Sequence, residues 1–314
     1  MPADVELNPL ATAPQRAELA VLLHASEPFL NDHRPGGQPL LGTAMGIELM
    51  FRAVRAMASG WAPEPRRFEQ VKVFAPLILQ HPTATVHVRA ECVANSGRAA
   101  IRCVVESRNG AEPPVPHFEA LCVDAQPGTA EPHPHPHTGM PTHGATNLPF
   151  TVNAADVYAV FFHGPAFRVV AAATRVGGEM VCEWQPALPA WTHAPTNAAQ
   201  PDPRWLELCL QTAGLLELAT TQRMLIPKRI ASVEHGAAPE RGTPGRVFAH
   251  AKRSEAGAAI DITLEKQDGT RLLHVRGYRT EPLPFSSDAV ALQALARRFN
   301  AAASTSSTFT TPPP

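Results

Sequence analysis

A proline-rich segment divides this chain of 314 residues into two blocks of similar order, and this division most constrains the fold. The segment runs from Ala125 to Pro149, and its composition is typical of an extended linker rather than of a packed core. Its four histidines lack a fixed frame, so we expect no metal site there. The chain is long enough for two medium domains or for one fold that has been duplicated.

The first block combines one apolar helix with a series of strands. Apolar residues recur at three- and four-residue spacing from Thr43 to Ala58, which predicts a helix with one buried face. Gly60 ends this helix. Four strand-like runs follow, with Asn109-Gly110 as a turn between two of them. We expect these strands at 70–79, 84–93, 99–107 and 118–123.

The second block repeats this order around a predicted helix from Arg204 to Thr221. One apolar helix against an antiparallel sheet is an α+β layer arrangement, and two copies side by side would form one continuous sheet around two buried helices. Two strands are expected before the helix and four after it, at 167–174, 179–185, 229–234, 247–253, 259–267 and 271–280.

The block boundaries predict four parts of the chain. Domains are expected at 1–125 and 149–285, with a linker between them at 126–148. Residues 286–314 are expected to form a flexible tail, in which a short helix at 289–298 precedes a disordered end rich in serine, threonine and proline.

The charge balance and the cysteines exclude several classes of function. The formal net charge is −1 and no basic stripe is present, which argues against nucleic acid and against an anionic membrane as partners. Five cysteines lie in apolar runs without CxxC spacing, so reduced thiols are expected rather than a zinc site. The acidic N-terminus is unlike a signal peptide, and no apolar run is long enough to span a bilayer. We therefore expect a cytoplasmic protein.

The segment from Pro28 to Gly37 places His33 on a glycine-rich turn just before the first apolar helix. An apolar surrounding favours the neutral imidazole, which can accept a proton at physiological pH. His33 is therefore a candidate general base.

The second predicted helix carries Glu207 and Gln211 one turn apart, which places both side chains on one helix face. Their neighbours are almost all apolar, so the Glu207 carboxylate lies either at a surface edge of the helix or is buried for a function. Burial would raise the pKa of Glu207 and allow it to hold a proton near neutral pH. Glu207 is therefore a candidate acid.

The loop from Phe161 to Phe167 joins glycine and proline to flanking aromatic residues, which is typical of a fixed loop that approaches a ligand closely. The Gly164 amide is a candidate donor to a substrate carbonyl. His163 could be catalytic, but a loop histidine that hydrogen-bonds the backbone is the favoured interpretation.

Three short motifs stand in order along the chain. His33, Gly37 and Gly42 fit the pattern histidine, three residues, glycine, four residues, proline, except that Gly42 takes the place of the proline. The segment 163–167 fits tyrosine-glycine-proline-x-phenylalanine with histidine in first place. The pair at 207 and 211 fits aspartate, three residues, glutamine, with glutamate in first place.

In this combination the chain, over roughly residues 20 to 285, resembles the dehydratase domain of modular polyketide synthases. The resemblance implies a double hotdog fold, in which two antiparallel sheets each wrap around a central helix and join into one continuous sheet. It also implies a hydro-lyase that removes water from a β-hydroxyacyl thioester on the phosphopantetheine of an acyl carrier protein, with no cofactor of its own. Other synthase domains would be further partners, and a homodimer is one possible assembly.

Under this interpretation His33 is the base and Glu207 is the acid, with no metal. The residues expected to contact substrate lie in the three motifs: Gln211, Gly164, His163 and Gly37. Two alternatives stay open. A hotdog isomerase or thioesterase would use the same pair, and a non-catalytic dehydratase-like domain would bind acyl chains or help to build a synthase. The presence of both a histidine and a carboxylate argues against the non-catalytic domain.

Overall fold

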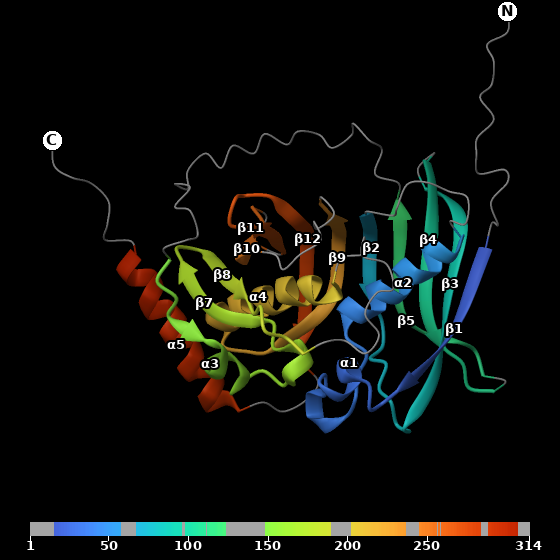
Figure 1. Ribbon diagram of the computed structural model, residues 1–314, viewed down its shortest axis with the longest axis horizontal. Coiled ribbons are helices and arrows are strands. Elements are labelled where there is room, and N and C mark those ends of the chain that lie inside the picture. Colours follow the sequence, from blue (N-terminus) through green and yellow to red (C-terminus); the bar gives the residue numbers. More distant parts are fainter. Residues whose placement is uncertain are drawn as a thin grey trace, which may run out of the picture.

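The computed structural model describes residues 16–57, 67–95, 98–110, 112–123, 148–189, 202–236, 245–255, 257, 259–283 and 288–306 (Figure 1). The linker predicted at 126–148 lies outside these residues except for its last position. The end of the predicted tail, 307–314, also lies outside them.

Twelve strands form one sheet in the described part of the chain, and every neighbouring pair is antiparallel. Five strands from the first block occupy one end of the sheet and seven from the second block occupy the other. Their spatial order is β1 (Arg16–His24), β3 (Thr83–Asn95), β4 (Arg98–Ser107), β5 (Val115–Val123), β2 (Arg67–Val73), β9 (Leu225–His235), β12 (Arg271–Pro282), β11 (Ile260–Lys266), β10 (Val247–Arg253), β8 (Glu179–Trp184), β7 (Val170–Val176) and β6 (Val152–Asn153).

The two blocks are joined at the middle of the sheet, where β2 pairs with β9. Val71 lies opposite Ile230 in this pair, and both side chains are buried. The strands that follow the first helix are ordered β3-β4-β5-β2, and those that follow the second are ordered β10-β11-β12-β9. The same order on both sides of the seam agrees with the repeat seen in the sequence, and it confirms one continuous antiparallel sheet.

Two long helices, α2 (Thr43–Met57) and α4 (Pro203–Thr221), lie against the curved sheet and contact each other (Figure 1). Helix α2 packs on β1, β3, β4 and β5, whereas α4 packs on strands of the second block. Twelve of the 15 residues of α2 are buried, so this helix is enclosed on most sides rather than on the one face expected. Gly46 allows this close packing, because a Cβ there would lie 2.8 Å from the Phe118 ring of β5.

Helix α4 begins and ends at residues suited to helix termini. The Asp202 side chain accepts a hydrogen bond from the Arg204 amide at 2.9 Å, and Pro203 occupies the first helical turn. Gln222 adopts a left-handed conformation with φ 57° and ends the helix. These local signals fix the helix that carries Glu207.

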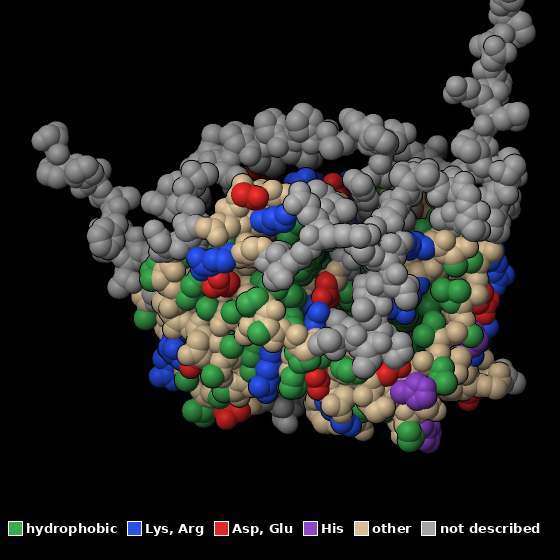
Figure 2. Space-filling model, in the orientation of Figure 1, with side chains coloured by type: hydrophobic (Ala, Val, Ile, Leu, Met, Phe, Trp, Pro, Cys, Tyr) green, Lys and Arg blue, Asp and Glu red, His purple; other side chains and the backbone are tan. Residues whose placement is uncertain are grey.

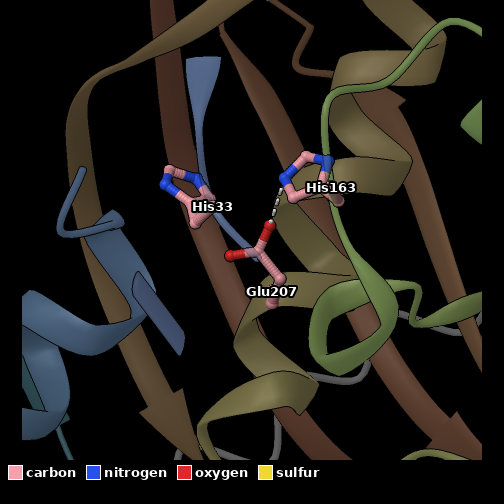
Figure 3. Close-up of side chains that lie close together, drawn as sticks. All are labelled: His33, His163 and Glu207. Atoms are coloured by element: carbon pink, nitrogen blue, oxygen red, sulfur yellow. Dashed lines mark ion pairs between the residues drawn. The ribbon is translucent and has the colours of Figure 1, made fainter. Parts of the chain in front are cut away.

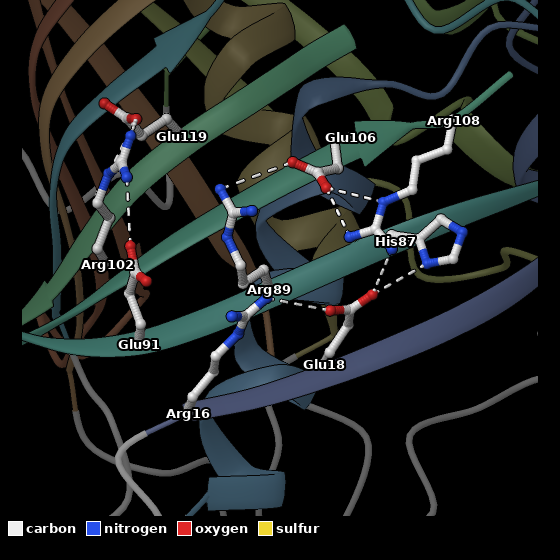
Figure 4. A network of polar contacts seen from close by, with 9 residues as sticks. All are labelled: Arg16, Glu18, His87, Arg89, Glu91, Arg102, Glu106, Arg108 and Glu119. Atoms are coloured by element: carbon white, nitrogen blue, oxygen red, sulfur yellow. Dashed lines mark hydrogen bonds and ion pairs between the residues drawn. The ribbon is translucent and has the colours of Figure 1, made fainter. Parts of the chain in front are cut away.

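The outer face of the first block carries a network of ion pairs across β1, β3, β4 and β5 (Figure 4). Arg108 contacts Glu18 at 2.7 Å and Glu106 at 2.8 Å, which ties β1 to β4 across β3. Arg102 pairs with Glu119 of β5. Single surface pairs contribute about 0–1 kcal/mol, so their main effect here is to favour this strand register.

The surface in view mixes charges of both signs with hydrophobic side chains (Figure 2). None of the helices in the described residues is both long and apolar enough to cross a membrane.

The helix predicted at 289–298 is present, but as α5 (Ala289–Ser306) it is longer and is part of the fold, so the prediction of a flexible tail is wrong over these residues. Helix α5 packs against β7 and α4, and Leu292, Leu295 and Phe299 are buried with helical spacing. Two short helices, α1 (Pro28–Asn31) and α3 (Ala154–Tyr158), precede the two loops that form the site described below.

His235 provides a test of how burial affects stability against acid. Both of its ring nitrogens are buried without a hydrogen-bond partner among the described residues, and its ring lies edge-on to Phe51 at 5.0 Å. Burial lowers the pKa of His235 to about 4. The unfolded chain, with a histidine pKa of about 6.5, therefore binds more protons than the folded chain between these values. The stability that the neutral His235 ring contributes above pH 6.5 is therefore lost as the pH falls toward 4.

We expect His235→Phe to reduce the stability lost between pH 7 and pH 5 by about 2 kcal/mol, because the variant keeps the aromatic contact without the titrating ring. Urea unfolding at both pH values measures the difference. The matched control, His24→Phe, changes an exposed histidine. An acid-induced loss in the His235 variant equal to that of the parent protein would contradict the prediction.

Candidate active site

A cavity of about 410 Å³ lies between the two blocks. Its walls come from the segment before α2, from α4, and from chain segments at the ends of β2, β9 and β12. Most of the lining is apolar, with His33, His163 and Glu207 at one place in the wall. The apolar lining from the two blocks includes Leu40, Phe74, Phe118, Phe161, Leu210 and Met224.

His33 is buried, with 8% of its surface exposed, and it lines this cavity. Its Nδ1 lies 2.8 Å from the Leu40 carbonyl oxygen, which assigns the ring proton to Nδ1 and leaves a lone pair on Nε2. Burial, together with the nearby charge of His163, lowers the pKa of His33 to about 4. The imidazole is therefore neutral at physiological pH, as the apolar setting in the sequence indicated.

Glu207 is buried on α4 and is held by two donors. Its Oε1 lies 3.2 Å from His163 Nε2 and 3.0 Å from Gln211 Nε2. The expectation of a raised pKa is wrong. Burial does oppose ionisation, but the hydrogen bond and charge of His163, the nearby His33 ring and the Gln211 amide together lower the pKa of Glu207. The carboxylate is therefore ionised at rest, and His163 Nε2 donates the shared proton.

Gln211 is predicted to bind substrate, and the structure places it at the cavity wall with its polar atoms already paired. Its amide nitrogen donates to Glu207 and, at 2.9 Å, to the Phe167 carbonyl. Its amide oxygen accepts a hydrogen bond from the Tyr158 hydroxyl at 2.9 Å. Gln211 therefore orients the Glu207 carboxylate. Sequence reasoning missed Tyr158, because its partner is 53 residues away.

The side chain of His163 does not form the backbone hydrogen bond that we expected from the sequence. Instead of a backbone hydrogen bond, its Nε2 contacts Glu207, and its ring stacks on Phe162 at 4.3 Å. Its Nδ1 is buried without a hydrogen-bond partner among the described residues. The backbone of His163 forms an antiparallel bridge with His33, so the two loops lie side by side.

Neither Gly37 nor Gly164 lines the cavity, which argues against both as substrate contacts. The Gly164 amide donates to the Asp32 carbonyl at 2.7 Å and so is not free for a substrate. A Cβ at Gly164 would lie 2.6 Å from Asp32 Cγ, which explains why the position requires glycine. Gly37 has φ 84° and shapes the turn before α2.

Asp32 fastens the two loops of the site together. Besides its carbonyl, its Oδ2 accepts a hydrogen bond from the Ala166 amide at 2.7 Å. His33 follows directly in sequence, so this contact sets the position of His33 relative to His163. Sequence reasoning missed Asp32, because no local signal connects it with a residue 134 positions away.

We expect Asp32→Ala to destabilise the protein by about 1–3 kcal/mol, because the Ala166 amide loses its acceptor. The matched variant Asp32→Asn keeps an oxygen acceptor and is expected to lose much less. Denaturant unfolding of the two variants and the parent protein measures the difference. Equal stability of the alanine and asparagine variants would contradict this role.

The described residues bring two imidazoles and one carboxylate together around one space (Figure 3). The nitrogen and oxygen atoms that they offer lie within 4.8 Å of one another. Figure 3 shows the second carboxylate oxygen of Glu207 on the side of His33. A neutral base and a carboxylate with a shared proton in an apolar cavity can remove one proton and deliver another.

Two family models match this chain in succession. One, described as polyketide synthase dehydratase domain, matches residues 10–108, and the other, described as polyketide synthase dehydratase N-terminal domain, matches residues 136–288. The matched segments span about four-fifths of the chain and include all three motifs. The chain belongs to the polyketide synthase dehydratases. In this family the expected role is dehydration during polyketide biosynthesis.

Solved structures of polyketide synthase dehydratases resemble this dehydratase chain in fold. The dehydratase domain of PpsC from Mycobacterium tuberculosis is 19% identical with a TM-score of 0.66, over 85% of this chain and 93% of that one. Two CurK dehydratase variants described as inactive, one with phenylalanine for a histidine and one with asparagine for an aspartate, are 17% and 18% identical. Their TM-scores are 0.63 and 0.62, over 88% and 91% of this chain and 96% of each variant. Comparison with curated proteins gave no match.

The role of Gly42, which stands where the family pattern has proline, could not be predicted from the motif alone. Gly42 lines the cavity at the start of α2, and a Cβ there would lie 3.3 Å from His33 Nε2. None of the described residues accepts a hydrogen bond from its amide. The family pattern has proline here, which lacks an N–H, so this chain has a donor beside His33 that the pattern does not provide.

Proposed function

We propose that this chain is an active hydro-lyase that removes water from a β-hydroxyacyl thioester and leaves an α,β-unsaturated acyl chain. The observation that carries this proposal is the position of a neutral, buried His33 opposite the ion-paired Glu207, in one apolar cavity. Base and carboxylate come from different blocks of the chain, so the fold itself brings the pair together.

The proposed elimination moves two protons. His33 Nε2 takes the proton from the α-carbon, and the electrons of that C–H bond form the double bond. The C–O bond at the β-carbon breaks, and the leaving hydroxyl takes the proton that a protonated His163 shares with the Glu207 carboxylate and departs as water, which leaves His163 neutral. Transfer of the proton from His33 back to this pair restores the site. Each general acid or base of this kind contributes about 10²–10⁴ in rate.

The thioester carbonyl needs a donor to stabilise the charge that develops on its oxygen. We assign this role to the Gly42 amide in place of Gly164, because Gly42 lines the cavity and its N–H is free. The start of α2 adds the partial positive charge of a helix N-terminus. One such donor is worth about 3 kcal/mol to the transition state.

The apolar lining suits an acyl chain, and a thioester substrate needs no cofactor resident in the protein. We propose that the acyl chain of the substrate is carried on the phosphopantetheine of an acyl carrier protein. Other synthase domains would be further partners of the protein, and the proposed assembly is a homodimer. We also interpret each block, 1–125 and 149–285, as one hotdog unit around its own helix. The inactive CurK variants, which change a histidine and an aspartate, support a histidine and a carboxylate as the pair to test.

The deciding experiment incubates the chain with a β-hydroxyacyl thioester on a carrier protein and follows the acyl group by mass spectrometry. Loss of one water, with the thioester intact, is the expected result. Release of the free acid and thiol would indicate a thioesterase. Movement of a double bond in an enoyl substrate, without water loss from the hydroxyacyl substrate, would indicate an isomerase. Binding without any reaction would indicate a non-catalytic domain.

A further inference from the structure

We propose that His33, His163 and Glu207 also form a binding site for one divalent transition metal ion, with zinc as the test ion. The ligands would be His33 Nε2, His163 Nε2 and the Glu207 carboxylate. Two imidazoles and one carboxylate, with a fourth position open to a cavity, form a ligand set well suited to zinc. This inference goes beyond the proposed dehydration and reverses the expectation of no metal.

The three side chains approach the same space from three elements. His33 comes from the segment before α2, His163 from the loop before β7, and Glu207 from α4 (Figure 3). Zinc bonds of about 2.0–2.1 Å in tetrahedral geometry place ligand atoms roughly 3.3 Å apart. The His163–Glu207 separation is already 3.2 Å, and all the offered atoms lie within 4.8 Å of one another. A small side-chain rotation of His33 therefore completes the set.

Neighbouring groups orient these ligands as they do in metal sites. The Leu40 carbonyl accepts the Nδ1 proton of His33 and so leaves the Nε2 lone pair available to a metal. The Gln211 amide donates to Oε1 of Glu207, the same carboxylate oxygen that His163 contacts. His163 Nδ1 is buried without a partner among the described residues, so it can carry the one ring proton that remains when Nε2 binds a metal.

Histidine at position 163 supplies the second imidazole, in place of the tyrosine of the family pattern. A metal at this site would occupy the Nε2 lone pair of His33, which the proposed elimination needs as its base. Metal binding and dehydration would then exclude each other, and zinc would inhibit the enzyme. The binding itself requires no substrate and no turnover.

The test measures zinc binding to the full-length chain without substrate, by isothermal titration calorimetry. The four histidines of the segment 125–149 are first replaced by serine, because they offer competing ligands. The expected result for this parent is saturable binding of one zinc ion. His33→Ala and His163→Gln in the same background are each expected to weaken it at least tenfold. Glutamine keeps a donor for Glu207, so His163→Gln is the variant more suited to fold.

Cobalt provides a second readout, since a tetrahedral cobalt complex with two histidines absorbs visible light and the apoprotein does not. Thermal unfolding confirms that each variant is folded before its binding is compared. Absence of saturable binding in the parent would overturn the proposal. Affinity that falls less than tenfold in either folded variant would also overturn it. Because no substrate is present, either result is independent of whether the chain is a dehydratase.

Discussion

Replacement of His33 by alanine is expected to lower the rate of dehydration by about 10³-fold or more, to the limit of detection. The reason is that the neutral His33, which lines the cavity, is the proposed base for the α-proton, and general-base help is worth a factor of about 10²–10⁴. The measurement is kcat/KM for the carrier-bound β-hydroxyacyl thioester, from the formation of the unsaturated product.

Substrate binding is the control for this variant, because loss of the base should leave the apolar cavity intact. Competition with a saturated acyl thioester tests whether the variant still binds the acyl chain of the substrate. An alanine variant that binds normally and retains more than about a tenth of the parent rate would rule out His33 as the base.

Glu207→Gln is expected to cost nearly as much, about 10²–10⁴ in kcat/KM. Glutamine fills the same volume but carries neither the negative charge that holds the His163 proton nor a proton of its own to deliver. The same assay measures this loss. A glutamine variant with the parent rate would remove Glu207 from the chemistry and leave His163 as the group to test.

The variant Glu207→Asp tests whether this site is built for the longer side chain. Aspartate is the residue of the family pattern, but the Glu207 carboxylate already lies 3.2 Å from His163 and 3.0 Å from Gln211. A side chain that is one methylene shorter would withdraw from both partners, and misplacement of this size costs on the order of 10²-fold. A rate equal to that of the parent, or higher, would instead indicate that glutamate has replaced the family aspartate without a functional need for the longer side chain.

Local patterns in the sequence were enough to predict the two central helices, α2 and α4, and most strands. Helices α2 and α4 lie within one residue of their predicted bounds, because apolar spacing and flanking glycine or proline define them. Strand β10 has its predicted bounds, Val247–Arg253. Strand β1 was missed, because it is an edge strand in which only Leu23 is fully buried, so its pattern of burial is weak.

Motif spacing found His33 and Glu207, but it could not define their electrostatics. The sign of the Glu207 pKa shift depends on His163, which is distant in sequence and meets it only in the folded chain. The choice between the Gly164 and Gly42 amides as donor to the thioester carbonyl depends likewise on Asp32. Its carbonyl accepts the hydrogen bond of the Gly164 amide through a contact between the two blocks. Such partners are set by tertiary packing, and a pattern within one segment contains no information about them.

The pairing of β2 with β9 joins the two blocks that carry the proposed catalytic pair, His33 and Glu207. The base and the carboxylate are mounted on opposite sides of this seam, so a small rotation about it changes the gap between them while each block keeps its own shape. Val71 and Ile230 are buried at the seam, and we expect a change in side-chain volume there to alter the rate of the proposed reaction without changing a residue of the site. Natural selection for the proposed reaction would then act on the relative orientation of the two blocks as well as on the residues that contact the substrate.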